Sequence, residues 1–125
     1  MIKGFHHIAI KTTDIERSTA FYRDVLGMRE KKRLHFDDGS YLIMLALGDT
    51  SVELFGGAKP KDPGEDRGEV GYVHLALSVD DVDREYARIK ALGYDFHIEP
   101  KSVQGLRVAF FRDPDGIPIE LLQEL

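Results

Sequence analysis

The chain has 125 residues, of which 42% are hydrophobic and 31% charged, and its formal net charge is −5. This size and composition predict one folded domain, and the acidic balance argues against a nucleic-acid partner. No apolar run is long enough to span a membrane, no signal-peptide pattern begins the chain, and cysteine is absent, so we expect a cytoplasmic protein whose metal ligands, if any, are nitrogen and oxygen.

The first half predicts a strand, a helix and three more strands. The first strand is the alternating segment Phe5–Ile10. A helix is expected over Asp14–Leu26, because Gly27 suits the left-handed position that follows a helix. Thr13 and Glu16 fit a capping box at its start. The three further strands are expected at Met28–Phe36, Ser40–Leu47 and Thr50–Phe55.

The second half predicts the same elements in the same order. Its first strand is Tyr72–Leu77, and its helix should begin at Asp80 or Asp81, whose carboxylates suit an N-cap. The helix should end at Gly93. The remaining strands are expected at Tyr94–Glu99, Leu106–Arg112 and Ile117–Gln123.

The repeated order predicts an α+β fold built from two strand–helix–strand–strand–strand modules. The modules span about residues 1–56 and 71–125. The segment between them, about 57–70, is rich in Gly, Pro and charged residues, which favours a linker or a flap over a site. The basic run Arg29–Arg33 is explained as a solvated strand edge.

Two histidines and two glutamates occupy equivalent places in the two halves. His74 follows His7 by 67 residues (74 − 7), and Glu120 follows Glu53 by 67 (120 − 53). The offset from histidine to glutamate is therefore 46 in each half. The first half carries one extra residue before Gly27, and it is compensated before Glu53.

Alternation along a strand predicts that these four side chains lie on one face of the sheet, opposite their apolar neighbours. A single strand histidine or glutamate is more often packed or solvated than a ligand. Four in repeated register predict a divalent metal site, suited to Ni²⁺, Zn²⁺, Co²⁺, Mn²⁺ or Fe²⁺ without a choice among them. His6 has the opposite parity to His7, and His35 and His97 have no counterpart in the repeat, so these three are expected to be structural or solvated.

The chain contains the motifs His7-Ile-Ala-Ile, Leu26-Gly27, Val52-Glu53-Leu54, His74-Leu-Ala-Leu and Asp113-Pro-Asp-Gly-Ile-Pro-Ile-Glu120. Together these motifs resemble the glyoxalase I family of the vicinal oxygen chelate superfamily. The resemblance covers essentially the whole chain. It implies one domain of residues 1–125, in which two βαβββ modules form a cupped, mostly antiparallel mixed sheet around a metal, with the helices outside. It also implies a homodimer with sites near the module or subunit interface.

The resemblance implies a metal ligand set of His7, Glu53, His74 and Glu120. The implied reaction converts the thiol hemithioacetal of a 2-oxoaldehyde to a 2-hydroxyacyl thioester through a metal-bound enediolate. Glu120 would be the base, and Glu53 its counterpart on the other side of the substrate.

Two positions depart from the glutathione-specific members of the family. Lys11, a predicted substrate-binding residue, stands where they have arginine, and Gly57 where they have asparagine. The sequence therefore does not decide which thiol the substrate contains. It also does not decide whether the two modules are exchanged between protomers. Two alternatives remain. One is another enzyme of the superfamily, an acyl-CoA epimerase or a thiol transferase, and the other is a non-catalytic dimer that binds a small molecule or an antibiotic.

Overall fold

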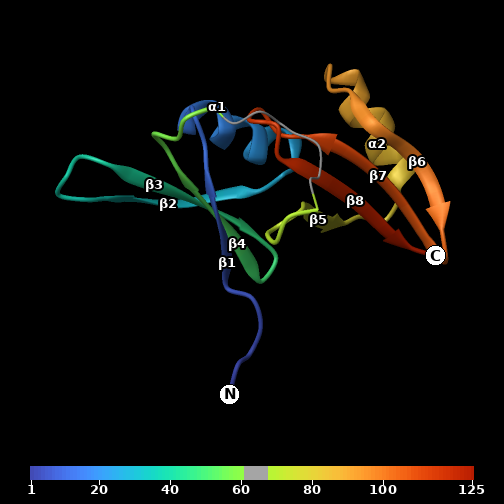
Figure 1. Ribbon diagram of the computed structural model, residues 1–125, viewed down its shortest axis with the longest axis horizontal. Helices are drawn as coiled ribbons and strands as arrows, with labels where there is room; N and C mark the ends of the chain where they lie inside the picture. Colours follow the sequence, from blue (N-terminus) through green and yellow to red (C-terminus); the bar gives the residue numbers. More distant parts are fainter. Residues whose placement is uncertain (61–67) are drawn as a thin grey trace. The chain divides into compact units, whose positions relative to one another are not determined.

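Each half of the chain folds into a unit of its own, with a helix between the first strand and the three that follow (Figure 1). The structure, a computed structural model, describes residues 1–60 and 68–125. Its two units are Met1–Pro60 and Lys61–Leu125, and each contains a four-stranded mixed sheet. The predicted α+β fold with two βαβββ modules is confirmed. Residues 61–67 of the expected linker lie outside the described part of the chain.

The first unit places its first and last strands side by side. Its sheet has the order β1-β4-β3-β2; β1 and β4 run parallel, and the other neighbours run antiparallel. The strand β2 is an edge, and most of its residues are exposed, as expected for the basic run. The elements are β1 (His7–Lys11), α1 (Ile15–Ala20), a π-helical segment η1 (Phe21–Val25), β2 (Arg29–His35), β3 (Tyr41–Leu47) and β4 (Thr50–Phe55).

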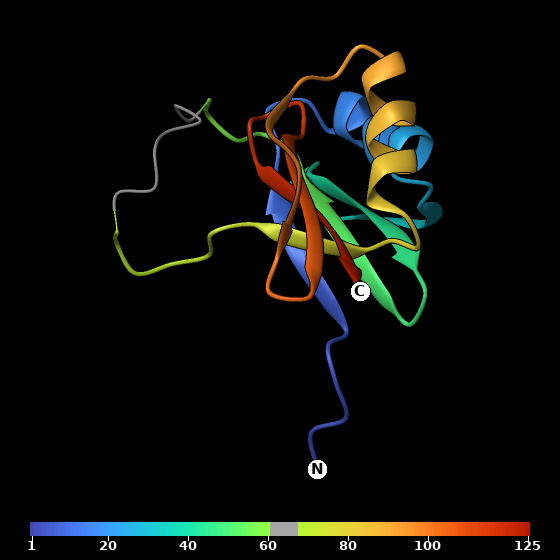
Figure 2. The same cartoon turned by 90° about the vertical axis from the view of Figure 1, so that its right-hand side faces the viewer.

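The second unit has the same topology, with the order β5-β8-β7-β6 and parallel pairing of β5 and β8. Its helix α2 contacts the strands β6, β7 and β8, and Figure 2 shows it lying along one side of this sheet. Among the described residues no helix is long and apolar enough to cross a membrane. The elements are β5 (Leu75–Ser78), α2 (Val82–Ala91), β6 (Phe96–Val103), β7 (Leu106–Arg112) and β8 (Pro118–Glu124).

An aspartate caps the N-terminus of each helix. Asp81, one of the two caps that the sequence predicted, accepts a hydrogen bond from the backbone N–H of Arg84. In the first unit the predicted capping box is wrong. The N-cap is Asp14, which accepts from the backbone N–H of Arg17 at 3.1 Å, while Glu16 binds other side chains. Both aspartates also place negative charge at the positive end of the helix dipole.

The extra residue of the first half is absorbed in its helix. Gly27 follows His7 by 20 residues (27 − 7), whereas Gly93 follows His74 by 19 (93 − 74). The first helix changes to π geometry over Phe21–Val25, where the backbone N–H of Leu26 donates to the carbonyl of Phe21, five residues back. A π turn holds one more residue than the α-helical geometry it replaces. The repeat therefore keeps its strand register despite the insertion.

Each unit has its apolar core on the helix side of its sheet. In the first unit the fully buried side chains of β3 and β4 include Ile43, Leu45 and Leu54, and the helical residues Phe21 and Tyr22 are buried as well. The second unit has a buried helix face of Val82 and Ile89, and buried Phe111, Ile119 and Leu121 on its strands. Burial of this apolar surface is the main term that stabilises each unit.

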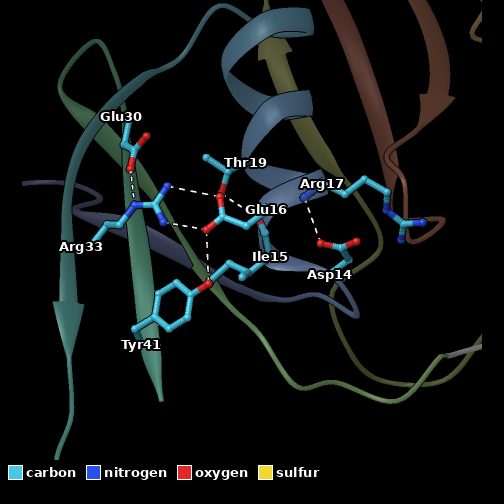
Figure 3. Close-up of polar contacts among 8 residues, drawn as sticks. All are labelled: Asp14, Ile15, Glu16, Arg17, Thr19, Glu30, Arg33 and Tyr41. Atoms are coloured by element: carbon cyan, nitrogen blue, oxygen red, sulfur yellow. Dashed lines mark hydrogen bonds and ion pairs between the residues drawn. The ribbon is translucent and has the colours of Figure 1, made fainter. Parts of the chain in front are cut away.

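A polar network ties α1 to the outer hairpin of the first unit (Figure 3). The guanidinium of Arg33 on β2 donates to Glu16 at 2.6 Å and to Glu30 at 2.7 Å. The hydroxyl of Tyr41 on β3 donates to the same Glu16 carboxylate at 3.2 Å. The hydrogen bond from Arg33 lowers the pKa of Glu16.

This network predicts a pH-dependent contribution to stability. Because the pKa of Glu16 is lowered on folding, its stabilisation is present above about 4.5, the pKa of an unperturbed glutamate, and is lost as the pH falls through the folded value. We expect the stability difference between the wild type and Glu16→Gln to shrink between pH 6 and pH 3 in urea unfolding. The variant Arg33→Gln supplies the second background of a double-mutant cycle. A difference that stays constant with pH, or that is equally large in the Arg33→Gln background, contradicts the assignment.

Candidate metal centre

The first unit brings His7 and Glu53 into contact. In the parallel register of β1 and β4, Ala9 is the partner of Glu53, and His7 is two residues before Ala9 on the same face. His7 Nε2 lies 2.8 Å from a carboxylate oxygen of Glu53. The methyl group of Ala9 leaves room beside the carboxylate for the imidazole ring. One pair of parallel strands thus brings together two residues that are 46 positions apart in the sequence.

The second unit repeats this arrangement with His74 and Glu120. Ala76 is the partner of Glu120 in the parallel register of β5 and β8, and His74 again comes two residues before the alanine. His74 Nε2 lies 3.1 Å from a carboxylate oxygen of Glu120. The predicted strand Tyr72–Leu77 is wrong at its start, since β5 begins at Leu75 and His74 immediately precedes it. The register survives because the backbone N–H of Val79 at the other end bonds to β8, at Leu122.

The two pairs have nearly equal exposure, which supports their equivalence. The side chains of His7 and His74 are 36% and 33% exposed, and those of Glu53 and Glu120 are both 13% exposed. Each carboxylate is therefore mostly shielded from water, while about a third of each histidine side chain stays exposed. Such a carboxylate needs a hydrogen-bond donor or a cation beside it.

Aromatic contacts separate the two faces of the sheet in the second unit. On the helix side, Phe96 lies between Tyr86 and Phe111, with ring centroids 4.8 and 4.9 Å apart. On the opposite side, Phe110 is the register partner of Glu120 and meets the ring of His74 edge-on, with centroids 5.3 Å apart. Glu120 and His74 therefore lie on the face that carries no helix of this unit.

His97 also contacts Phe110. Its ring centroid is 6.0 Å from that of Phe110. Partial burial, and secondarily the charge of Arg112, lower the pKa of His97, so its imidazole is neutral near pH 7. Its counterpart among the unassigned histidines, His35, stacks on Tyr41 in the first unit with centroids 5.4 Å apart. Of His35 and His97, His97 is thus the one whose ring contacts a neighbour of a proposed ligand pair.

Lys11 is the predicted substrate-binding residue, and Gly57 is the second position that departs from the glutathione-specific pattern. Lys11 ends β1 and has the strand parity of His7 and Ala9, so its side chain leaves the same face of the sheet. Gly57 has φ of +79°, in the left-handed region that favours glycine.

Strand parity misplaced one residue, His6. The sequence assigned it to the face opposite His7, yet Nδ1 of His6 lies 2.8 Å from Nδ1 of His7. Alternation holds within a strand, and β1 begins only at His7. Phe110 was also not singled out in the sequence, although a signal for it exists. Two phenylalanines are consecutive in this strand, so one of them must point to the face opposite the helix.

A tight turn fixes the approach of β7 to β8. Asp113 is 95% buried, and its carboxylate accepts hydrogen bonds of 2.9 Å from the backbone N–H groups of Asp115 and Ile117. Asp113 is thus a turn residue, as expected, rather than a ligand. The turn places Phe110 and Glu120 opposite each other.

The donor chemistry of the two pairs fits a divalent metal. Each unit supplies one imidazole nitrogen and one carboxylate oxygen, which suit transition-metal ions. Over residues 1–60 and 68–125, no group of three or more His, Cys, Asp or Glu side chains gathers within a unit. One unit alone therefore supplies two ligands.

The chain belongs to the Glyoxalase/Bleomycin resistance protein/Dioxygenase superfamily, whose sequence profile matches residues 4–121. It is similar to YaeR of Escherichia coli (35% identity over 98% of each chain). It is also similar to a probable lactoylglutathione lyase of Vibrio cholerae, with 34% identity over 94% of this chain and 88% of that one.

Three solved structures share the fold. SMU.1112c has a TM-score of 0.86 and 32% identity, over 98% of this chain and 99% of that one. TnmS3, an antibiotic binding protein from Streptomyces sp. CB03234, has a TM-score of 0.79 and 29% identity, over 99% and 98%. A mutant of the fosfomycin resistance protein FosX from Listeria monocytogenes, complexed with Mn(II), has a TM-score of 0.75 and 25% identity, over 97% and 92%.

The turn before β8 makes a prediction about stability. Replacing Asp113 by Ala leaves two backbone N–H groups without their acceptor, so we expect a loss of about 1–3 kcal/mol in the free energy of unfolding. Urea denaturation measures it. Asp113→Asn retains an acceptor oxygen and should lose less. Equal losses for the two variants would contradict the role of these hydrogen bonds.

Proposed function

We propose that the chain is a divalent-metal-dependent lyase/isomerase of glyoxalase I type, acting in the cytoplasm as a homodimer. The proposed metal ligands are His7, Glu53, His74 and Glu120, two from each unit. The observation that carries the proposal is the repeated contact of an imidazole nitrogen with a half-buried carboxylate, in the same strand register, in a chain of this superfamily. A divalent metal bound there would act as a Lewis acid on a substrate with two neighbouring oxygens.

The proposed reaction is an isomerisation of a 2-oxoaldehyde hemithioacetal. A proton leaves the carbon that carries the sulfur and returns to the neighbouring carbon, which gives a 2-hydroxyacyl thioester. Glu120 is the proposed base, and Glu53 is its counterpart on the other side of the substrate. Phe110 lies beside Glu120 and would keep water from that carboxylate, which favours return of the proton to the substrate.

Lys11 is the proposed contact for an anionic part of the substrate. Lys11 lies four residues after His7 on β1, and its side chain is on the same face of the sheet. An ammonium is a compact charge without the planar fork of arginine, so it attracts a carboxylate without fixing its orientation. This favours a substrate thiol other than, or in addition to, glutathione.

Two other functions have specific support. The likeness to the FosX variant complexed with Mn(II) favours the broader alternative of another metal-dependent enzyme that acts on a different chelating substrate, with an acyl-CoA epimerase or a thiol transferase as the candidates. The likeness to TnmS3 favours a binding protein for a small molecule. The retention of both His–Glu contacts favours an enzyme, because a sheltered carboxylate beside an imidazole is unnecessary for packing an apolar ligand.

Metal affinity tests the ligand set. We expect Glu53→Gln and Glu120→Gln each to weaken binding of Ni²⁺ or Zn²⁺ by more than about tenfold, since loss of even an outer-sphere partner commonly costs that much. Competition with a chromophoric chelator measures it. Glu99→Gln is the control, because Glu99 contacts Tyr86 on the helix side of the second unit. Unchanged affinity in both ligand variants, or a metal-free wild type after reconstitution, would overturn the site.

Activity tests the proposed base. The metal-reconstituted wild type is assayed with hemithioacetals of several thiols, alongside acyl-CoA epimerisation. At saturating metal, Glu120→Gln should lower kcat by about 10²- to 10⁴-fold with a smaller effect on KM, because the proton transfer is lost and the binding is retained. Full activity of a folded, metal-loaded Glu120→Gln would exclude this residue as the base. Epimerisation without lyase activity would favour the second enzyme class, and EDTA-insensitive ligand binding without turnover would favour a binding protein.

A further inference from the structure

The ring of His7 has a partner at each of its nitrogens. Nε2 lies 2.8 Å from Glu53, and Nδ1 lies 2.8 Å from Nδ1 of His6. The two imidazole rings meet edge to face, at 84° with centroids 5.1 Å apart. The backbone of His6 is anchored as well, because its carbonyl accepts a hydrogen bond of 3.1 Å from the N–H of Ser51 at the start of β4. His6 is therefore fixed beside His7 and is not part of a free terminal arm.

The contact between the two rings can form in either direction. A neutral imidazole carries one N–H donor and one acceptor nitrogen. Without metal, the Glu53 carboxylate can only accept, so Nε2 of His7 carries the proton and Nδ1 of His7 accepts from Nδ1–H of His6. With a metal on Nε2 of His7, the His7 proton must be on Nδ1, which then donates to an unprotonated Nδ1 of His6. Each ring carries one proton before and after, so the pair remains hydrogen-bonded in both states.

We infer that His6 is a positioning residue for the proposed metal ligand His7: it accepts the Nδ1–H of His7 when Nε2 binds metal, and so fixes the tautomer and ring orientation needed for ligation. This inference rests on the proposed metal site. A hydrogen bond from the second ring nitrogen to an outer partner is the usual way in which a ligating histidine is oriented, and its loss commonly costs about ten- to hundredfold in metal affinity.

The second unit supplies an internal comparison. Val73 occupies the place of His6, one residue before His74, and has no ring nitrogen to offer. The ring of His74 instead packs edge-on against Phe110. The repeat therefore orients its two histidines by different means, a hydrogen bond in the first unit and aromatic packing in the second.

Three variants of the full chain test the role of His6 through metal affinity. We expect His6→Val, which copies the second unit, to weaken Ni²⁺ or Zn²⁺ binding by about ten- to hundredfold. His6→Asn, whose amide oxygen can accept from Nδ1–H, should recover most of that loss. Val73→Ala is the matched control and should leave the affinity unchanged. Thermal melts of the metal-free variants check that all three fold.

Nitrogen-15 NMR of histidine-labelled protein adds a readout that a merely structural role would not move. In the wild type, metal should shift the protonated nitrogen of His7 from Nε2 to Nδ1 and that of His6 from Nδ1 to Nε2. Wild-type affinity in His6→Val, equal losses in His6→Val and His6→Asn, or no tautomer change at His6 would overturn the inference.

The same measurements separate this inference from the proposed function. Metal binding with the expected His6 dependence but without lyase activity would refute the proposed reaction and leave the role of His6 supported. A wild type that binds no divalent metal would overturn both.

Discussion

Parallel pairing of the first and last strands in each unit is the constraint on which the site depends. It brings together residues that lie 46 positions apart, and it sets an alanine opposite each glutamate with the histidine two residues earlier. A parallel pair needs a long crossover, and here the helix and two strands provide it. A slip of one residue would turn each His–Glu pair into the apolar core, so the register is fixed by burial as much as by hydrogen bonds.

The two faces of each sheet hold different kinds of side chains. The helix side holds the apolar core, with side chains such as Ile43 and Ile119 that have no exposed surface. The other side holds the carboxylates, which would destabilise a core if they were left unpaired. The imidazole contacts satisfy them, and among the described residues no buried side-chain nitrogen or oxygen lacks a partner. The proposed metal ligands thus lie on the face of each sheet that is opposite the apolar core.

The repeat preserves the ligand pairs and changes their surroundings. The first unit holds an inserted residue in a π turn, ties α1 to its outer hairpin through Arg33, and places His6 against His7. The second unit has a regular helix and packs Phe110 against His74.

The sequence by itself determined the repeat, the order of elements, the strand parity of the four proposed ligands and the turn at Asp113, because these follow from local periodicity and from equal spacing. It predicted a cap at Asp80 or Asp81, and Asp81 is the cap, whereas the cap predicted at Thr13 is wrong because two neighbouring residues could both cap the first helix. Only the tertiary structure decided that His6 lies against His7 and that Phe110 meets His74. Ring orientations depend on neighbours brought together from distant strands, and no local pattern encodes them.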